Sequence, residues 1–206
     1  MKQKTNVGEM TKMALLTAVI LVMAFTPLGY LKTAGIEITF IMIPVAIGAI
    51  TSGPKAGAFL GGVFGVTSFI QCFGMSQFGM LLLGVSPVRT FLLCMIPRIL
   101  MGFLAGWIFI GLSKVDKKGT YSYAVSSLSC AVINTVLFVG GVGLLFRDTM
   151  LAQAQEAGIS LLSLLMTFVT INSIIEMIAC LVVGAVISRV IDRAFGKKAR
   201  RVQETE

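Results

Sequence analysis

Residues 87–112 read PVRTFLLCMIPRILMGFLAGWIFIGL, and this stretch decides the class of fold. Its only charged residues are Arg89 and Arg98, and it exceeds the roughly 20 residues that a helix needs to cross the hydrocarbon core of a bilayer. The whole chain of 206 residues has the same character, because 56% of its residues are apolar and 13% are charged. Soluble domains carry about 25% charged residues. We therefore predict an integral membrane protein.

Five more charge-poor runs extend this pattern along the chain. They cover residues 10–29, 38–52, 54–73, 121–146 and 160–190. The sequence thus predicts an all-α membrane protein, a compact bundle of six transmembrane helices that forms a single domain over residues 1–206, with a basic tail at about 192–206. The boundary at Gly53-Pro54 is the least defined, since a turn and a kink have the same signature there, and five spans are the alternative.

The distribution of positive charge predicts how the bundle is oriented. Six spans place both termini on one side, together with thirteen of the 17 Lys and Arg residues. The other four, Lys32, Arg89, Arg98 and Arg147, fall on the opposite side or within the span at 87–112. By the positive-inside rule, both termini face the cytoplasm in a multi-pass protein of the cell membrane. The net charge of +8 therefore indicates contact with the lipid bilayer, and no nucleic acid partner is expected.

The composition argues against an enzyme, a metal site and a cofactor. The chain has no histidine and no close pair of carboxylates, so the commonest metal-binding and general-base arrangements are missing. Its four cysteines, Cys72, Cys94, Cys130 and Cys180, lie far apart in apolar surroundings and lack a C-x-x-C spacing. We predict that they serve as packing residues.

Four polar residues lie deep inside the predicted spans: Arg98, Asn134, Asn172 and Glu176. A charge at this depth is costly unless it is paired or hydrated, so each charged group needs a partner. Two interpretations are open. An Arg98–Glu176 ion pair within a structural network is one, and a polar ligand cavity that opens outward is the other. We favour the cavity, because ionisable residues inside a membrane usually mark functional sites.

The outer loops add further candidates for ligand binding. Residues 73–79, FGMSQFG, are Gly-rich and uncharged and follow Gln71, and they form either a lid or an ordinary interfacial loop. Ser76 and Gln77 supply neutral hydrogen-bonding groups there. Arg89, at the outer end of its span, either attracts an anion or reaches the headgroups.

Aromatic residues narrow the class of ligand. Tyr30 is the only tyrosine that we expect on the outer half of the bundle, and the other aromatic residues expected there are phenylalanines. A planar ring ligand is usually held by stacking on Trp or Tyr, so their scarcity favours a small, flexible, aliphatic anion. Arg98 would meet its carboxylate, and Asn134 and Asn172 would meet hydroxyl or amide groups.

Small residues repeat at intervals of four in three places. Gly53, Gly57, Gly61 and Gly65 form one stripe, Gly102 and Gly106 form another, and Ala14 and Ala18 form a third near the cytoplasmic end of the first span. Small residues at this spacing let two helices approach closely. We predict internal helix packing for the glycine stripes.

Several segments resemble one known family. The stretch ITFIMIPVAIGAI at 38–50, the stretch GPKAGAFLGGVFGVTSF at 53–69, Ser86-Pro87, and PRILMG at 97–102 are similar to the substrate-binding S components of energy-coupling-factor (ECF) vitamin transporters. The chain length, the six spans and the basic C-terminal tail fit the same family. Within it, Pro27-Leu-Gly-Tyr30 ahead of the Ile-Thr-Phe and Ile-Pro-Val segments looks most like the pantothenate-type members.

The resemblance implies a function and a set of partners. S components bind a vitamin on the extracellular half of the membrane, and they are thought to topple in the membrane to carry it inward. They dock on a transmembrane T component attached to two ATP-binding cassette ATPases, and an Ala-x-x-x-Ala pattern that Ala14 and Ala18 match forms the docking surface. By position, the resemblance makes Arg98, Asn134 and Asn172 ligand groups. Glu176 is a departure, since a carboxylate that held Arg98 would withhold the guanidinium from the substrate.

Three hypotheses follow for the function. The first is a vitamin-binding subunit, for pantothenate or for another water-soluble vitamin such as folate or a thiamine precursor. The second is an ion-coupled small-solute transporter that uses Glu176. The third is a membrane scaffold in which packing explains every polar residue.

Overall fold

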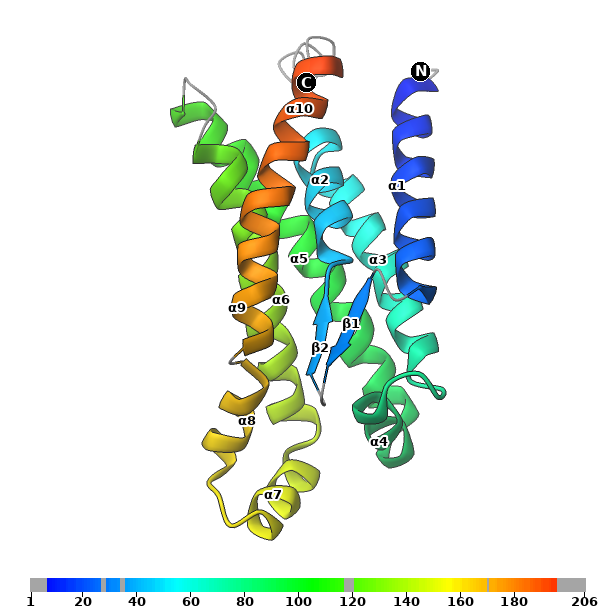
Figure 1. The fold of residues 1–206 in the computed structure, drawn as a ribbon, viewed down its shortest axis with the longest axis vertical. Coiled ribbons are helices and arrows are strands. Elements are labelled where there is room, and N and C mark those ends of the chain that lie inside the picture. The colour runs from blue at the N-terminus through cyan, green and yellow to red at the C-terminus, as the bar shows by residue number, and fades with distance from the viewer. Residues whose placement is uncertain (1–6, 27–28, 34–35, 117–120, 170, 196–206) are drawn as a thin grey trace.

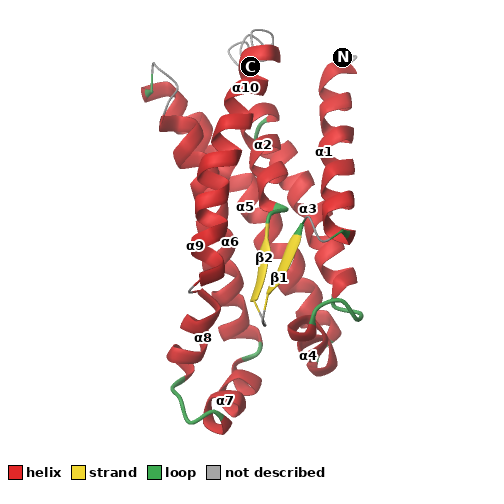
Figure 2. Ribbon diagram, in the orientation of Figure 1, coloured by secondary structure: helices red, strands yellow, loops and turns green. Residues whose placement is uncertain are grey.

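The computed structural model describes residues 7–26, 29–33, 36–116, 121–169 and 171–195, with the backbone alone at 30–33, 36–38, 167–169, 171–172 and 192–195. It is a bundle of helices with one two-stranded β-hairpin in its middle (Figure 1, Figure 2). In chain order the helices are α1 (Val7–Phe25), α2 (Met42–Ser52), α3 (Pro54–Gln71), α4 (Gln77–Val85), α5 (Pro87–Val115), α6 (Tyr121–Leu145), α7 (Arg147–Glu156), α8 (Leu161–Val169), α9 (Ile171–Ala179), the π-helix η1 (Cys180–Gly184) and α10 (Ala185–Phe195). The strands are β1 (Tyr30–Thr33) and β2 (Ile36–Thr39).

Four stretches within the described residues are helical, long and apolar enough to cross a membrane. They are α1, α5, α6 and the run Ser173–Ile191, which joins most of α9 to η1 and α10. The helices α2 and α3 are not among them, because α2 is too short and α3, a continuous helix of 18 residues, is not apolar enough. The prediction of a mainly helical membrane protein is confirmed at this level, and the count of six spans remains a prediction.

The short helix α2 lies at the centre of the bundle. Every residue from Met42 to Thr51 is buried, and Ile20 and Ala24 of α1, Leu60 and Phe64 of α3 and Met101 of α5 belong to the same core cluster. At 11 residues α2 is about 16 Å long, roughly half of the hydrocarbon thickness. The hairpin continues from its N-terminal end, so the helix and the hairpin follow one another along the length of the bundle (Figure 1).

The glycine stripes hold α3 against α5 as predicted. A Cβ built on Gly57 would collide with the carbonyl of Gly102, and one built on Gly61 would collide with the carbonyl of Arg98. The two antiparallel helices therefore touch backbone to backbone, which only glycine permits. This contact fixes the position of Arg98, because its carbonyl lies directly on α3.

Three predicted elements differ from the structure. The first span ends at Phe25 and the second begins at Met42, and a β-hairpin lies between them where we expected a loop and the start of a helix. The Gly-rich outer loop is in fact a turn followed by helix α4. Within the sixth predicted span, over 160–190, the helical run Ile171–Phe195 is not a uniform α-helix, because the π-helix η1 lies between α9 and α10.

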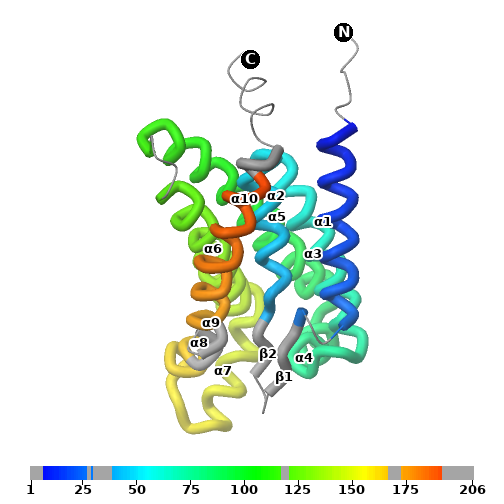
Figure 3. The backbone as a smooth tube through the Cα atoms, turned by 45° about the horizontal axis from the view of Figure 1, so that its top comes forward, coloured from blue at the N-terminus to red at the C-terminus, as the bar shows by residue number. Residues whose placement is uncertain are grey.

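The two ends of the described chain lie close to one end of the bundle. The start of α1 and the end of α10 are both at the top of Figure 1, and Figure 3 shows the same arrangement from a second angle. The helices α4 and α7 lie at the opposite end of the bundle. The candidate site described next is in this second half.

Candidate functional site

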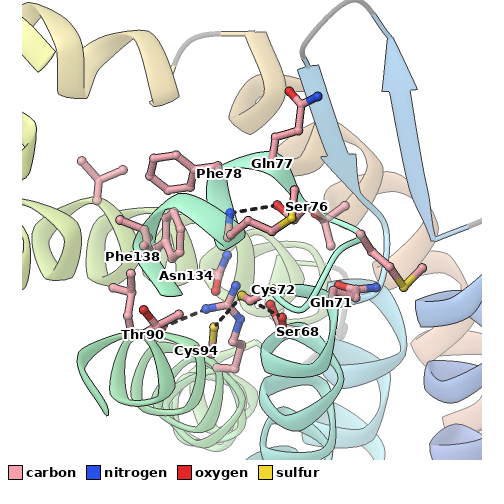
Figure 4. Close-up of a pocket in the computed structure, with 18 of the residues that line it drawn as sticks. Ser68, Gln71, Cys72, Ser76, Gln77, Phe78, Thr90, Cys94, Asn134 and Phe138 are labelled. Carbon is pink, nitrogen blue, oxygen red and sulfur yellow. Dashed lines mark hydrogen bonds between the residues drawn. The ribbon is translucent and has the colours of Figure 1, made fainter. Parts of the chain in front are cut away.

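A cavity of about 680 Å³ opens between β2, the end of α3, α4, α5, α6 and α9. Its volume falls within the range of about 300–1,000 Å³ that is usual for small-molecule sites. Six of the predicted site residues contribute to its wall, namely Gln71, Ser76, Gln77, Arg98, Asn134 and Glu176. Figure 4 shows most of these side chains around the same space.

Arg98 is the cationic group of this wall, and its side chain is 8% exposed. The guanidinium carbon lies 5.2 Å from the ring centre of Phe64 and 5.2 Å from that of Phe138, so two aromatic faces hold the charge. Its Nη1 donates a hydrogen bond of 2.9 Å to the carbonyl of Leu93. Its Nε has no hydrogen-bond partner among the described residues. The guanidinium has five N–H donors, so this buried cation keeps donors that a ligand can use.

Glu176 does not pair with Arg98. Among the side chains that the structure describes, Arg98 forms no ion pair within 4.0 Å. The carboxylate oxygen Oε1 of Glu176 instead accepts a hydrogen bond of 2.7 Å from the backbone N–H of Thr39. Thr39 ends the hairpin's strand β2, whose other edge pairs with β1. Glu176 thus satisfies a strand-edge N–H that would otherwise be unpaired in the membrane interior.

Asn134 and its neighbours supply neutral polar groups. The Oδ1 of Asn134 on α6 is buried and has no hydrogen-bond partner among the described residues. The adjacent Thr135 donates a hydrogen bond of 3.4 Å to Ser173 on α9, and both residues line the cavity. An unpaired buried carbonyl oxygen is costly, so Asn134 is suited to accept a hydrogen bond from a ligand's hydroxyl or amide group.

The turn between α3 and α4 forms one edge of the cavity. Gln71, which is 6% exposed, donates a hydrogen bond of 2.5 Å to the carbonyl of Ala24 and so ties this edge to α1. Ser76 caps α4, because its hydroxyl accepts a hydrogen bond of 3.2 Å from the N–H of Gly79. Gln77 is the first residue of α4 and is exposed.

Three predicted site residues are not seen in the cavity wall. Arg89 is exposed, and its Nη1 donates a hydrogen bond of 3.2 Å to the carbonyl of Leu145 at the end of α6, so it joins two helix ends. The side chains of Tyr30 and Asn172 lie outside the described part of the chain, although the backbone places Tyr30 in β1 and Asn172 in α9.

Several wall residues were missed from the sequence. They include Thr39, Ser68, Cys72, Thr90, Cys94 and Ser173. Thr90, Cys94 and Arg98 are each four residues apart on α5, so they share one face of the helix. The first two could therefore have been predicted as wall residues, because they lie on the same helix face as Arg98. Thr39 could not be found in this way, because the hairpin brings it to the cavity.

The cysteines divide into two groups. Cys130 and Cys180 are buried in the apolar core, in agreement with their predicted role in packing. Cys72 and Cys94 instead line the cavity, and their sulfur atoms lie 4.0 Å apart. Within the described residues no group of three or more His, Cys, Asp or Glu side chains could hold a metal ion.

The chemistry of the cavity is that of a binding site for a small anion with polar groups. It presents one guanidinium, the side-chain amides of Gln71, Gln77 and Asn134, hydroxyls and one carboxylate, with phenylalanine among its apolar groups. Such a set can bind a carboxylate at one point and hydroxyl or amide groups at others.

Comparison with known proteins adds to this picture. A family model described as "ECF transporter, substrate-specific component" matches residues 9–188. The pantothenate transporter PanT of Leuconostoc mesenteroides subsp. mesenteroides is 32% identical over 184 residues, which cover 84% of this chain and 87% of that protein. The match of the family model includes every residue named above in the cavity wall. The chain therefore belongs to the family of substrate-specific components of ECF transporters.

Proposed function

We propose that this protein is the subunit that binds pantothenate for an ECF-type importer. The similarity to PanT supports the choice of vitamin, and the cavity supports the chemistry. Pantothenate is an aliphatic anion with one carboxylate, one amide and two hydroxyls. The observation that carries the proposal is the buried guanidinium of Arg98, a cation that forms no ion pair among the described residues, at the wall of a cavity of suitable size.

The ligand's groups match the side chains of the wall one by one. The carboxylate binds Arg98, whose guanidinium supplies charge-assisted hydrogen bonds. Asn134 accepts a hydrogen bond from the amide N–H or a hydroxyl through its Oδ1. Glu176 accepts a hydrogen bond from a hydroxyl of the ligand. The ligand also contacts Gln71, Ser76 and Gln77 at the edge of the cavity. Further ligand residues, by their position in the chain, are Tyr30 and Asn172.

We further propose six crossings with both termini in the cytoplasm. The clustering of the described chain ends at one end of the bundle supports an even number of crossings. The pair formed by α2 and the hairpin fills the depth of one span, and α3 fills another. The excess of Lys and Arg near both termini and in the loop after α5 supports the cytoplasmic side for that end. The cavity then lies in the outer half.

The energy for uptake comes from other chains in this proposal. The partners are a T component and two ATP-binding cassette ATPases, which are implied by membership of the family. Ala14 and Ala18 are the proposed contact with the T component, and both are exposed on α1. They take no part in the apolar core of the described residues, so they are available to another helix.

One experiment tests the vitamin. The chain is purified alone, the small molecule that accompanies it is identified by mass spectrometry, and pantothenate binding is measured by calorimetry without ATP. We expect pantothenate to co-purify and to bind at least tenfold more tightly than pantothenol, in which a hydroxymethyl group replaces the carboxylate. Equal affinity for both compounds, or the recovery of a different vitamin, would reject the assignment.

A further inference from the structure

Helix α5 contains a proline one residue before Arg98, and this proline changes the hydrogen bonding of the helix. In a regular helix the N–H of residue 97 would donate to the carbonyl of Leu93, four residues earlier. Pro97 has no N–H, so the backbone provides no such donor. The carbonyl of Leu93 is left in a buried part of the helix, where an unpaired oxygen is costly.

The side chain of Arg98 supplies the missing donor. Its Nη1 lies 2.9 Å from the oxygen of Leu93, a residue that is 2% exposed and lines the cavity. This bond turns the guanidinium back along its own helix. Phe64 and Phe138, each 5.2 Å from the guanidinium carbon, fix the group from α3 and α6. The Nε then remains without a partner among the described residues.

We propose that Pro97 is a positioning residue for ligand binding: by removing one backbone N–H, it provides the carbonyl that orients the guanidinium of Arg98 toward the ligand's carboxylate. The proposal rests on the proposed function, since it assigns the ligand's anionic end to Arg98. Pro97 itself needs no contact with the ligand. Its effect passes through Leu93 and Arg98, which explains why a helix-breaking residue is placed in the middle of a span.

An alanine at this position would restore the regular bond. In Pro97→Ala, the new N–H donates to Leu93 and competes with Nη1, so the guanidinium loses its anchor. The same change removes a helix breaker, and we expect no loss of thermal stability. Pro87→Ala is the matched control. Pro87 is the first residue of the same helix, where its missing N–H has no partner in any case.

The test compares two ligands and two backgrounds. We expect Pro97→Ala to weaken pantothenate binding at least tenfold, to change pantothenol binding less than twofold, and to have no further effect when combined with Arg98→Ala. Pro87→Ala should leave both affinities as they are. Equal weakening of both ligands by Pro97→Ala would show a general distortion of α5 and would overturn the proposal, as would a full effect of Pro97→Ala in the Arg98→Ala background.

A second measurement separates this proposal from the proposed function. The ¹⁵N resonances of the Arg98 guanidinium, recorded without ligand, report the bond from Nη1 directly. We expect Pro97→Ala to shift them and Pro87→Ala to leave them in place. If the unmodified protein binds no pantothenate but these resonances respond as expected, the choice of vitamin fails and the role of Pro97 stands. Unchanged resonances in Pro97→Ala reject that role, whatever the ligand.

Discussion

Arg98 is the residue on which ligand binding should depend most. We expect Arg98→Ala to weaken pantothenate binding by about 2 kcal/mol or more, roughly 30-fold, because a charge-assisted hydrogen bond in a buried site is lost. Calorimetry on the purified chain measures the change. Arg89→Ala is the matched control, since Arg89 is exposed and binds the end of α6 outside the cavity wall. Comparable losses in both variants would contradict the site.

The four cysteines offer a test of the cavity itself. Cys72 and Cys94 line it, whereas Cys130 and Cys180 are buried in the apolar core. A small anionic thiosulfonate reagent should therefore modify the first pair in the folded protein and leave the second pair untouched, and pantothenate should slow the reaction at least fivefold. Peptide mapping by mass spectrometry locates the adducts. Equal modification of all four, with unfolding excluded by the melting temperature, would mean that the cavity is not the route of access.

The presence of several of these residues in the cavity wall could be predicted from the sequence. A charge or an amide in the middle of an apolar span has few explanations, so Arg98, Asn134 and Glu176 were identified as candidates without coordinates. Their hydrogen bonds could not be predicted. The partner of Glu176 is a backbone N–H at residue 39, and no pattern in the sequence links these two positions.

The hairpin is the element that distinguishes this bundle from a set of simple spans. An isolated two-stranded hairpin is marginally stable, and unpaired backbone N–H and C=O groups at its edges are unfavourable inside a membrane. Here the N–H of Thr39 binds Glu176 on α9, so the edge is satisfied by another element. Residues 36–50 are almost wholly apolar, and within such a run periodicity alone does not separate a short strand from a helix. This is why the sequence predicted the start of a helix too early.

Removing the carboxylate should release the hairpin. We expect Glu176→Ala to increase amide hydrogen exchange at Thr39 and its strand at least tenfold, because the N–H loses its acceptor. Glu176→Gln keeps an acceptor oxygen and should show a smaller increase. Glu156→Gln, at an exposed carboxylate of α7, is the control and should change nothing. Slow exchange at residue 39 in Glu176→Ala would show that another contact holds the strand.

The contact between α3 and α5 gives a prediction with a neighbouring control. A Cβ on Gly61 would collide with the carbonyl of Arg98, whereas a Cβ on Gly62 would lie 3.8 Å from its nearest neighbour, the Cγ1 of Ile99. Gly61→Ala should therefore destabilise the protein by about 1–3 kcal/mol, as overpacking does, and weaken ligand binding through Arg98. Gly62→Ala should be neutral or slightly stabilising, since alanine favours helix. Thermal unfolding in detergent compares the two.

The sixth predicted span has a change of helix type that its local sequence does not predict. Residues 160–190 are apolar enough for one regular helix, but the helical run of the structure contains a π-helix at Cys180–Gly184. Gly184 packs against Ser127 of α6, and a Cβ there would lie 3.1 Å from the serine hydroxyl. The change in helix type accompanies this tertiary contact, and such contacts are not encoded in the local pattern.

The arrangement of the whole molecule separates two tasks. The cavity lies between the hairpin, α4, α5, α6 and α9, while Ala14 and Ala18 lie on α1, which does not line it. Gln71 connects the cavity to α1, because it lines the cavity and donates a hydrogen bond to the carbonyl of Ala24 on α1. A protein of this design can bind a ligand with one surface and a partner subunit with another.

This separation predicts that uptake and binding can be uncoupled. Replacing Ala14 or Ala18 with Trp should abolish pantothenate uptake by cells or vesicles that contain the T component and the ATPases, because a large side chain prevents the close approach of another helix. Binding by the isolated chain should stay within twofold of the original value, since neither residue contacts the cavity. The control is Val136→Trp, because Val136 lies on α6 and is 64% exposed. This large residue on another outer surface should leave uptake intact. Uptake that survives both alanine replacements would place the docking surface elsewhere on the molecule, whereas loss of binding would show that α1 contributes to the site through its link to Gln71.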